Sequence, residues 1–232
     1  MTKISQINAV ILSGGLGKRL RSEIGESQKV MTQVKGVPFL DYHLTSLKKQ
    51  GIGKIILCTG YKSDEVEAYY RTHSYGLNIQ FSREDKPLGT GGAVKQARAM
   101  IDSDPFFVMN GDSFVDIDLG AILQYHMLKQ SKVSVVIARV LDAKDFGTII
   151  LDAQNCIIQF EEKNTSDASY VNAGVYCFSK SVFDLMPAQE HFSLEYDVFP
   201  RLAGRDIFGF LVDKSFLDIG TPERLNQAKN IL

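Results

Sequence analysis

The sequence is poor in cysteine, and its opposite charges nearly cancel. Three cysteines, Cys58, Cys156 and Cys177, lie far apart in 232 residues without a Cys-x-x-Cys pair, so we expect reduced thiols in the core and no disulfide. The 26 basic side chains face 27 acidic ones, a formal net charge of -1. This balance excludes a general electrostatic attraction to nucleic acid or to an anionic membrane. Any phosphate must therefore be bound by a local site.

Long apolar runs are missing as well. The apolar stretch nearest the N-terminus extends only from Ala9 to Leu12 and runs into glycines, so we expect no signal peptide, no membrane span and a cytoplasmic protein. A content of 44% hydrophobic and 23% charged residues argues against a disordered or fibrous chain. The length fits a single domain, residues 1–232, that folds without disulfides or a structural metal.

Short apolar strands alternate with helices in the first half of the chain. Strands are predicted at residues 9–12, 54–60, 78–82 and 106–109. Helices are predicted from Pro38 to Lys49, from a capping Ser63, and after Gly92. This alternation predicts a parallel sheet with helices on both faces and ligands beyond the carboxyl ends of its strands.

The second half is richer in strands. They are predicted at 133–140, 148–151, 156–160, 171–178 and 207–212, the second and third forming a hairpin. Short helices are predicted at 181–186 and 194–202, and a last helix from Pro222. The fold class is therefore a Rossmann-like mixed α/β domain: a mostly parallel sheet, helices on both faces, and an antiparallel extension. The boundary between the two halves is placed at about residue 140.

A glycine-rich turn follows the first strand, at Gly14-Gly15-Leu16-Gly17-Lys18-Arg19-Leu20. A Walker A loop would need Ser or Thr where Arg19 stands, and the dinucleotide fingerprint would need glycine where Leu20 stands, so both motifs are excluded. The turn still offers backbone amides without side chains, which can approach a phosphate or a base, and these are followed by a fixed cation. A tight strand-to-helix turn that binds nothing is the alternative.

A second cation, Lys29, lies ten positions after Arg19. The polar segment between them, 21–28, has no helical period and is predicted to be a loop. A loop with a cation at each end can fold over a triphosphate, Arg offering a planar fork and Lys a compact charge. Two solvated surface charges are the alternative.

Several motifs, taken together and in order, resemble those of the sugar-phosphate nucleotidyltransferases. The matching segments are the glycine-rich turn with Lys29, Gly36-Val37-Pro38, Pro87-Leu88-Gly89-Thr90-Gly91-Gly92-Ala93, Asn110-Gly111-Asp112, Phe146-Gly147, Glu162-Lys163, Asn172-Ala173-Gly174 and Leu217-Asp218-Ile219-Gly220-Thr221-Pro222. The resemblance covers essentially the whole chain. It implies an enzyme that joins a nucleoside triphosphate to a sugar 1-phosphate and releases pyrophosphate.

The resemblance also assigns roles to residues. It implies Mg²⁺ held by Asp112 and Asp218, with Arg19, Lys29 and Asp112 as the catalytic residues. A nucleotide-binding part of about residues 1–140 and a sugar-binding part of about 141–232 are expected. The sugar phosphate would be bound by Gly147, Glu162, Lys163 and Asn172. The sequence leaves a homodimer open.

Guanine is the expected base. Leu12, Gly14, Gly15, Gly17, Gly89 and Thr90 would frame the nucleotide. Glu84 could accept from the ring N–H and the amino group of guanine; a solvated glutamate at a strand end is the alternative. Within the family the chain most resembles the D-glycero-α-D-manno-heptose 1-phosphate guanylyltransferases, which make an activated heptose for surface polysaccharide. The alternatives are mannose, glucose or muramic acid 1-phosphate with another nucleotide, and a non-catalytic regulator that binds a sugar nucleotide.

The chain departs from the family pattern at two positions. Lys18 stands where the family usually has Thr, and Gln28 stands where it usually has Pro. Loss of that proline predicts a less preorganised loop before Lys29. We expect no C-terminal β-helix of the kind that many relatives append.

Overall fold

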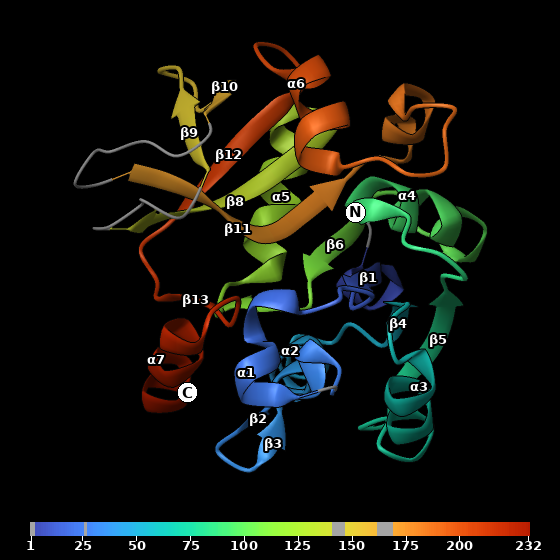
Figure 1. The fold of residues 1–232 in the computed structure, drawn as a ribbon. Helices are drawn as coiled ribbons and strands as arrows, with labels where there is room; N and C mark the ends of the chain where they lie inside the picture. The colour runs from blue at the N-terminus through green and yellow to red at the C-terminus, as the bar shows by residue number, and fades with distance from the viewer. Residues whose placement is uncertain (1–2, 26, 141–146, 162–168) are drawn as a thin grey trace.

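A nine-stranded sheet forms the centre of the computed structural model, which describes residues 3–25, 27–140, 147–161 and 169–232 (Figure 1). The main path of the sheet runs β10-β9-β11-β6-β1-β4-β5, and β8 joins it through β11 and carries β12. Among the described residues, none of the helices has the length and apolar character needed to cross a membrane.

The parallel part of the sheet lies in the first half of the chain. Its strands are β1 (Asn8–Leu12), β4 (Lys54–Thr59), β5 (Asn78–Arg83) and β6 (Phe106–Asn110). Val10 of β1 pairs with Ile56 on one side and with Val108 on the other, and all three side chains are buried. Runs of buried apolar residues are typical of parallel strands covered on both faces, and the predicted parallel sheet is confirmed.

Helices cover both faces of this sheet. One face packs against α2 (Phe39–Lys49), α3 (Ser63–Thr72) and α5 (Leu119–Lys129). The other packs against α4 (Gly89–Gln96), η4 (Ala97–Met100), η5 (Lys180–Leu185), η6 (Leu194–Val198) and α6 (Phe199–Leu202). Alternate residues of β1 divide between the two layers, Ala9 and Ile11 facing the first and Val10 the second. The molecule therefore has two apolar cores, one on each face.

The antiparallel extension is confirmed in the second half. Its strands are β8 (Val133–Val140), β9 (Thr148–Leu151), β10 (Ile157–Glu161) and β11 (Ser169–Phe178), and β12 (Ile207–Val212) adds to β8 in parallel. β11 is the central strand, since it runs antiparallel to β6, β8 and β9, and β9 and β10 form the predicted hairpin. One sheet thus continues across residue 140.

Smaller elements complete the fold. η1 (Ile4–Gln6) precedes β1, and the others are η2 (Lys18–Leu20), α1 (Arg21–Ile24), η3 (Lys29–Met31), β2 (Gln33–Val34), β3 (Val37–Pro38), β7 (Ser113–Val115), β13 (Phe216–Asp218) and α7 (Pro222–Ile231). A third apolar cluster joins α7 to α2 through Phe39, Leu225 and Ala228. This packing brings the last helix back beside the first elements of the chain (Figure 1).

The structure corrects several expectations. The segment 21–28, predicted to be a loop, contains α1, which is one helical turn and too short to show a period. The helix expected after Gly92 begins at Gly89 and includes the glycines. Ser63 does not cap α3, because Lys62 occupies the cap position and no side-chain bond caps the helix. The three cysteines are free and buried, as predicted.

Candidate active site

The glycine-rich turn is packed against two neighbouring loops. Ser13 continues β1 by donating its N–H to the carbonyl of Cys58. A Cβ on Gly14 would lie 2.8 Å from Oε1 of Glu84, and a Cβ on Gly60 would lie 3.1 Å from Cα of Gly14. The close approach of these three loops explains why residue 14 is glycine, because a side chain there would displace Glu84.

Backbone donors are exposed along this turn. Within the described part of the chain, the N–H groups of Gly14, Gly15 and Leu16 donate to no other residue. A Cβ on Gly15 would meet nothing within 4 Å, so this part of the turn faces open space. Successive unpaired amides are suited to an anion or to the acceptors of a base.

The turn borders a cavity of about 400 Å³ at the carboxyl ends of the parallel strands. Of the residues predicted to act, Leu12, Gly14, Gly15, Lys29, Glu84, Gly89, Thr90 and Asp112 line it. Residues for which no binding or catalytic role was predicted also line it, among them Ser13, Gln28, Asn110 and His191. A cavity of this size can hold a nucleotide-sized ligand. The prediction that ligands bind beyond the strand ends therefore agrees with the shape of the molecule.

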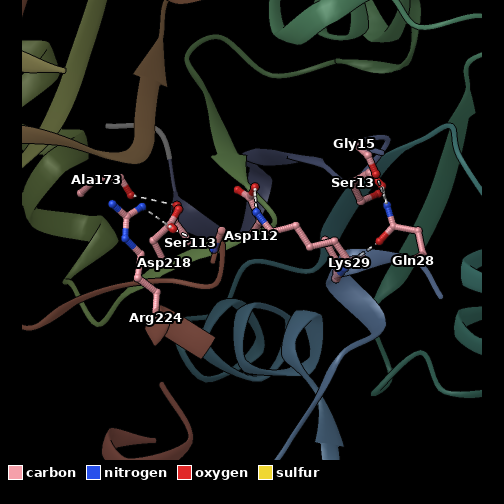
Figure 2. Close-up of polar contacts among 11 residues, drawn as sticks. Ser13, Gly15, Gln28, Lys29, Asp112, Ser113, Ala173, Asp218 and Arg224 are labelled. Atoms are coloured by element: carbon pink, nitrogen blue, oxygen red, sulfur yellow. Dashed lines mark hydrogen bonds and ion pairs between the residues drawn. The ribbon is translucent and has the colours of Figure 1, made fainter. Parts of the chain in front are cut away.

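Lys29 reaches from the loop to the far wall of the cavity. Its Nζ lies 2.7 Å from Oδ2 of Asp112, and its side chain is 10% exposed (Figure 2). Gln28, which stands before Lys29 in place of the usual proline, is fully buried and bonded to the glycine-rich turn. Hydrogen bonds supply the constraint that a proline would have given through its ring.

Asp112 and Asp218 are brought together by a short pair of strands. β13 pairs with β7 so that Asp218 lies opposite Ser113, and the N–H of Ile219 donates to the carbonyl of Asp112 at 3.0 Å. Oδ1 of Asp218 accepts from the Gly220 N–H at 2.8 Å and from Nη1 of Arg224 at 3.0 Å. Figure 2 shows the two aspartates side by side, with Lys29 beyond one and Arg224 beyond the other.

The two carboxylates suit a hard divalent cation. Oδ1 of Asp112 and Oδ2 of Asp218 accept no hydrogen bond from a described residue. Mg²⁺ is commonly held by one or two carboxylates, with water and substrate phosphate completing the shell. Across the described residues no group of three or more His, Cys, Asp or Glu side chains converges, so an all-protein cage such as a structural zinc site is not present there.

Arg19 and Gly17 lie beside the cavity and not in its lining. Arg19 is exposed on η2, and its Nη2 lies 3.6 Å from the position that a Cβ of Gly220 would take. Its guanidinium is therefore close to the segment that carries Asp218. Gly17 precedes η2 in a left-handed conformation with φ of 56°, which glycine adopts at little cost.

The loop from Pro87 to Gly92 is shaped by Phe192. Gly89 has φ of 74°, and a Cβ there would lie 2.5 Å from the Phe192 carbonyl oxygen. That oxygen accepts from the N–H groups of Gly91 and Gly92 and so satisfies the start of α4. The glycines of this motif therefore allow close packing, and Gly89 and Thr90 are left on the cavity wall.

The residues predicted for the sugar side are only partly described. Gly147 is exposed just before β9, and the pairing of Thr148 with Val171 brings it next to Asn172 on β11. Neither Gly147 nor Asn172 lines the cavity. Glu162, Lys163 and Phe146 lie outside the described residues.

A chain of hydrogen bonds joins Asn172 to the cavity. Asn172 Nδ2 donates to the Tyr176 hydroxyl at 2.8 Å, and that hydroxyl donates to Glu195 Oε1 at 3.4 Å. Glu195 Oε2 accepts from the Thr90 hydroxyl at 2.7 Å. No role was predicted for Glu195, because its position between two predicted sites depends on partners far away in the sequence.

An unsatisfied acceptor also faces this region. Oδ1 of Asn110 is buried and accepts no hydrogen bond within the described part of the protein. Asn110 is also one of the residues that line the cavity. A buried polar atom without a partner is costly unless a ligand supplies one. The Asn-Gly-Asp motif drew attention to Asp112 because carboxylates bind metals, and it gave no comparable signal for the amide before it.

The comparisons with known proteins agree with this geometry. The profile of the nucleotidyl transferase family matches residues 8–232. D-glycero-α-D-manno-heptose 1-phosphate guanylyltransferase of Aneurinibacillus thermoaerophilus is 35% identical, covering 97% of this chain and 98% of its own. The enzyme of that name from Campylobacter jejuni is 36% identical, covering 94% and 96%.

A solved structure is similar over almost the same extent. The crystal structure of HddC from Yersinia pseudotuberculosis complexed with GMP-PN has a TM-score of 0.86 and 32% identity, covering 97% of this chain and 98% of that one. The sheet, the glycine-rich turn and the family profile thus point to one conclusion. This chain belongs to the nucleotidyl transferase family of enzymes, which make nucleotide sugars from a nucleoside triphosphate and a sugar 1-phosphate.

Proposed function

We propose that this protein transfers GMP from GTP to D-glycero-α-D-manno-heptose 1-phosphate and releases pyrophosphate. The two relatives named for that reaction match the chain over nearly its full length. The observation that carries the choice of guanine is the position of Glu84 in the cavity.

Glu84 is held where a base would lie. Its N–H donates to the Thr59 carbonyl at 2.7 Å, and its Oε2 accepts from the Leu88 N–H at 3.0 Å. Its Oε1 lies over Gly14 and accepts no hydrogen bond from a described residue. Burial raises the pKa of this carboxyl group, because a desolvated carboxylate lacks the water that would stabilise its charge. Guanine N1–H and the 2-amino group are the donors that such an acceptor needs.

The phosphates would extend from the base toward Lys29. Free amides at Gly14, Gly15 and Leu16 offer donors along the turn, and Arg19 offers a cation for the leaving pyrophosphate. Lys29 is already at the wall that carries Asp112, so it would reach charge that develops on the transferred phosphate. A sugar phosphate is ionised at neutral pH, so the attacking oxygen needs no general base.

A divalent metal is common in nucleotidyltransferases of this family, and we propose Mg²⁺. Asp112 and Asp218 would hold it through the oxygens that face away from Lys29 and Arg224. When bound, the ion neutralises charge on the α-phosphate. On the acceptor side, Gly147, Glu162, Lys163 and Asn172 would bind the sugar phosphate, and residues 141–232 would form the sugar-binding part.

A comparison of nucleotides tests the proposal. Pyrophosphate release with heptose 1-phosphate is measured with GTP, dTTP and UTP, and GTP is expected to exceed the others in kcat/KM by roughly 10²–10⁴, because two buried hydrogen bonds are lost with the other bases. Glu84→Gln should narrow this gap, and Asp85→Asn, which removes a charge from the exposed neighbour, should not. Equal use of dTTP and GTP would contradict the guanine assignment and leave the family assignment standing.

A further inference from the structure

Gln28 is a buried amide that joins two parts of the candidate site. Its side chain has no exposed surface. Nε2 donates to the carbonyl oxygen of Ser13 and, at 3.3 Å, to that of Gly15 (Figure 2). Oε1 accepts from the Val30 N–H at 2.6 Å. Both ends of the carboxamide are therefore used inside the protein, which fixes the amide orientation.

The two carbonyls that Gln28 holds determine where the neighbouring amides point. In a trans peptide the C=O and the N–H of the same unit point in opposite directions. The carbonyls of Ser13 and Gly15 face Gln28, so the N–H groups of Gly14 and Leu16 point away from it. Neither of these N–H groups donates to a described residue. Gln28 thus occupies the carbonyl side of the turn and leaves its donors free for a ligand.

The other end of the same amide acts on the loop of Lys29. By accepting from Val30, Oε1 caps η3, the turn that begins at Lys29. The capped turn directs the Lys29 ammonium to Asp112, 2.7 Å away. The backbone N–H of Gln28 also donates to Oε2 of Glu65 at 3.3 Å, which ties the loop to α3.

We infer that Gln28 is a positioning residue that sets the free amides of the turn and the Lys29 ammonium in one fixed relation. The inference rests on the proposed function in that both groups are taken to act on the same triphosphate. A carboxamide is required, since it donates on one side and accepts on the other. Methionine has the size without the hydrogen bonds, and an ionised glutamate would be repelled by both carbonyls.

Substitution with matched controls tests the inference. Gln28→Met is expected to lower kcat about 10-fold or more and to weaken GTP binding about 10-fold, because each lost hydrogen bond to a positioned group is worth about a factor of ten. The KM for the sugar 1-phosphate should stay within about twofold. Gln33→Met, at an exposed glutamine five positions on, should change none of these values. A merely structural role would lower the thermal midpoint of Gln28→Met and leave kcat and GTP affinity of the folded fraction unchanged, which would overturn the inference.

A pH profile adds a second test, in which circular dichroism at each pH confirms that the variant is folded and activity is given per folded protein. In Gln28→Glu the protonated acid can donate to one carbonyl while accepting from Val30, whereas the ionised form cannot. Burial between carbonyls raises the pKa of a carboxylic acid, so activity relative to wild type should rise several-fold as the pH falls from 8 to 6. A flat ratio would contradict the inference. If Gln28→Met does not fold, Gln28→Glu prepared at pH 6 is compared with wild-type protein in its place.

The inference and the proposed function can fail separately. If wild-type protein does not use GTP with heptose 1-phosphate, the proposed function is wrong, and calorimetric titration with pyrophosphate still measures whether Gln28 holds the turn. If wild-type protein turns over and Gln28→Met behaves as Gln33→Met does, the inference is wrong and the proposed function stands.

Discussion

Each aspartate of the candidate site is paired with a cation from another element. Lys29 approaches Asp112, whose side chain is 41% exposed, and Arg224 approaches Asp218, which is 19% exposed. The Lys29 side chain is only 10% exposed, and breaking an ion pair with a buried partner is costly. A divalent cation would therefore bind the other oxygen of Asp112 and leave Lys29 in place. Arg224 would likewise remain with Asp218.

Removing either carboxylate should stop the reaction. Asp112→Asn and Asp218→Asn are each expected to abolish pyrophosphate release while circular dichroism shows an unchanged fold, because the proposed metal would contribute several kcal/mol through its charge at the transferred phosphorus. Asp116→Asn, at an exposed aspartate nearby, is the control and should keep full activity. Near-wild-type turnover of either variant at saturating Mg²⁺ would rule out the metal assignment.

Replacing Arg19 and replacing Lys29 should change different kinetic constants. Arg19 is exposed beside Gly220 and would bind the leaving phosphates in the ground state, so Arg19→Ala should raise the KM for GTP. Lys29→Ala should chiefly lower kcat, since its charge is proposed to act on the transition state. Steady-state kinetics separate the two effects. A Lys29→Ala enzyme with normal kcat and a raised KM would overturn this division.

At the scale of elements, β11 ties the two halves of the site together. The Ser113 hydroxyl donates to the Ala173 carbonyl at 3.3 Å, which holds β7 against β11. Gly174 follows with φ of 73°, and a Cβ there would lie 2.4 Å from Ser113 Oγ. The strand of Asn172 and the strand next to Asp112 can approach this closely only because residue 174 has no side chain.

Gly174→Ala should therefore destabilise the protein through both conformation and contact. A left-handed alanine costs about 1–2 kcal/mol, and forcing a methyl group against Ser113 adds about 1–3 kcal/mol. Gly204→Ala is the control, because Gly204 has φ of 78° with nothing within 4 Å of its Cβ position. Denaturant unfolding of both variants measures the difference. Equal losses would show that the close approach at Gly174 contributes nothing.

The sequence predicted elements where burial leaves a clear pattern. The parallel strands β1, β4 and β6 are short apolar runs bounded by turn residues, and all four of the parallel strands were found. α5 was missed, because its apolar residues surround the helix and give little periodicity. Its N-terminus did carry a signal, since Asp118 caps it by accepting from the N–H groups of Gly120 and Ala121.

Some residues of the candidate site could be predicted from the sequence and others could not. Glycines and charged residues within a motif, such as Gly14, Lys29 and Asp112, could be selected from the chain itself or from its resemblance to a family. Gln28 and Glu195 could not, because their roles depend on partners far away in sequence, such as Ser13 and Thr90. A polar residue inside a core is recognised only when its neighbours are known.

At the scale of the whole molecule, two buried histidines, His126 and His43, pack between elements as uncharged side chains. His126 on α5 contacts the hydroxyls of Ser131 and Ser134 at 3.0 Å and that of Ser179 at 2.9 Å. His43 on α2 is fully buried, with its ring edge against Phe114. Burial lowers the pKa of each to about 4, from an ordinary value of 6.5. Both imidazoles are thus neutral in the folded protein at pH 6.

Stability should consequently fall in mild acid. Below pH 6.5 the unfolded chain binds protons at these histidines that the folded protein does not bind, so the free energy of unfolding decreases until the folded pKa near 4 is reached. Each histidine should account for a loss of about 3 kcal/mol between pH 7 and pH 4. Urea unfolding at several pH values measures the slope, and His126→Gln should reduce it. An unchanged slope in that variant would contradict the assignment to His126.

The pairing of β13 with β7 also bears on how the protein is made. A ribosome adds residues in order, so the glycine-rich turn, Lys29 and Asp112 have all left it long before Asp218 is translated. For the first part of that interval β6 lacks its neighbour β11, and until Asp218 is translated the carboxylate pair is incomplete. A nascent or prematurely ended chain can therefore offer the cavity walls to a nucleotide without the second aspartate. On the proposed metal assignment such fragments would not consume the nucleotide, since β13, the last strand to be synthesised, carries the second aspartate.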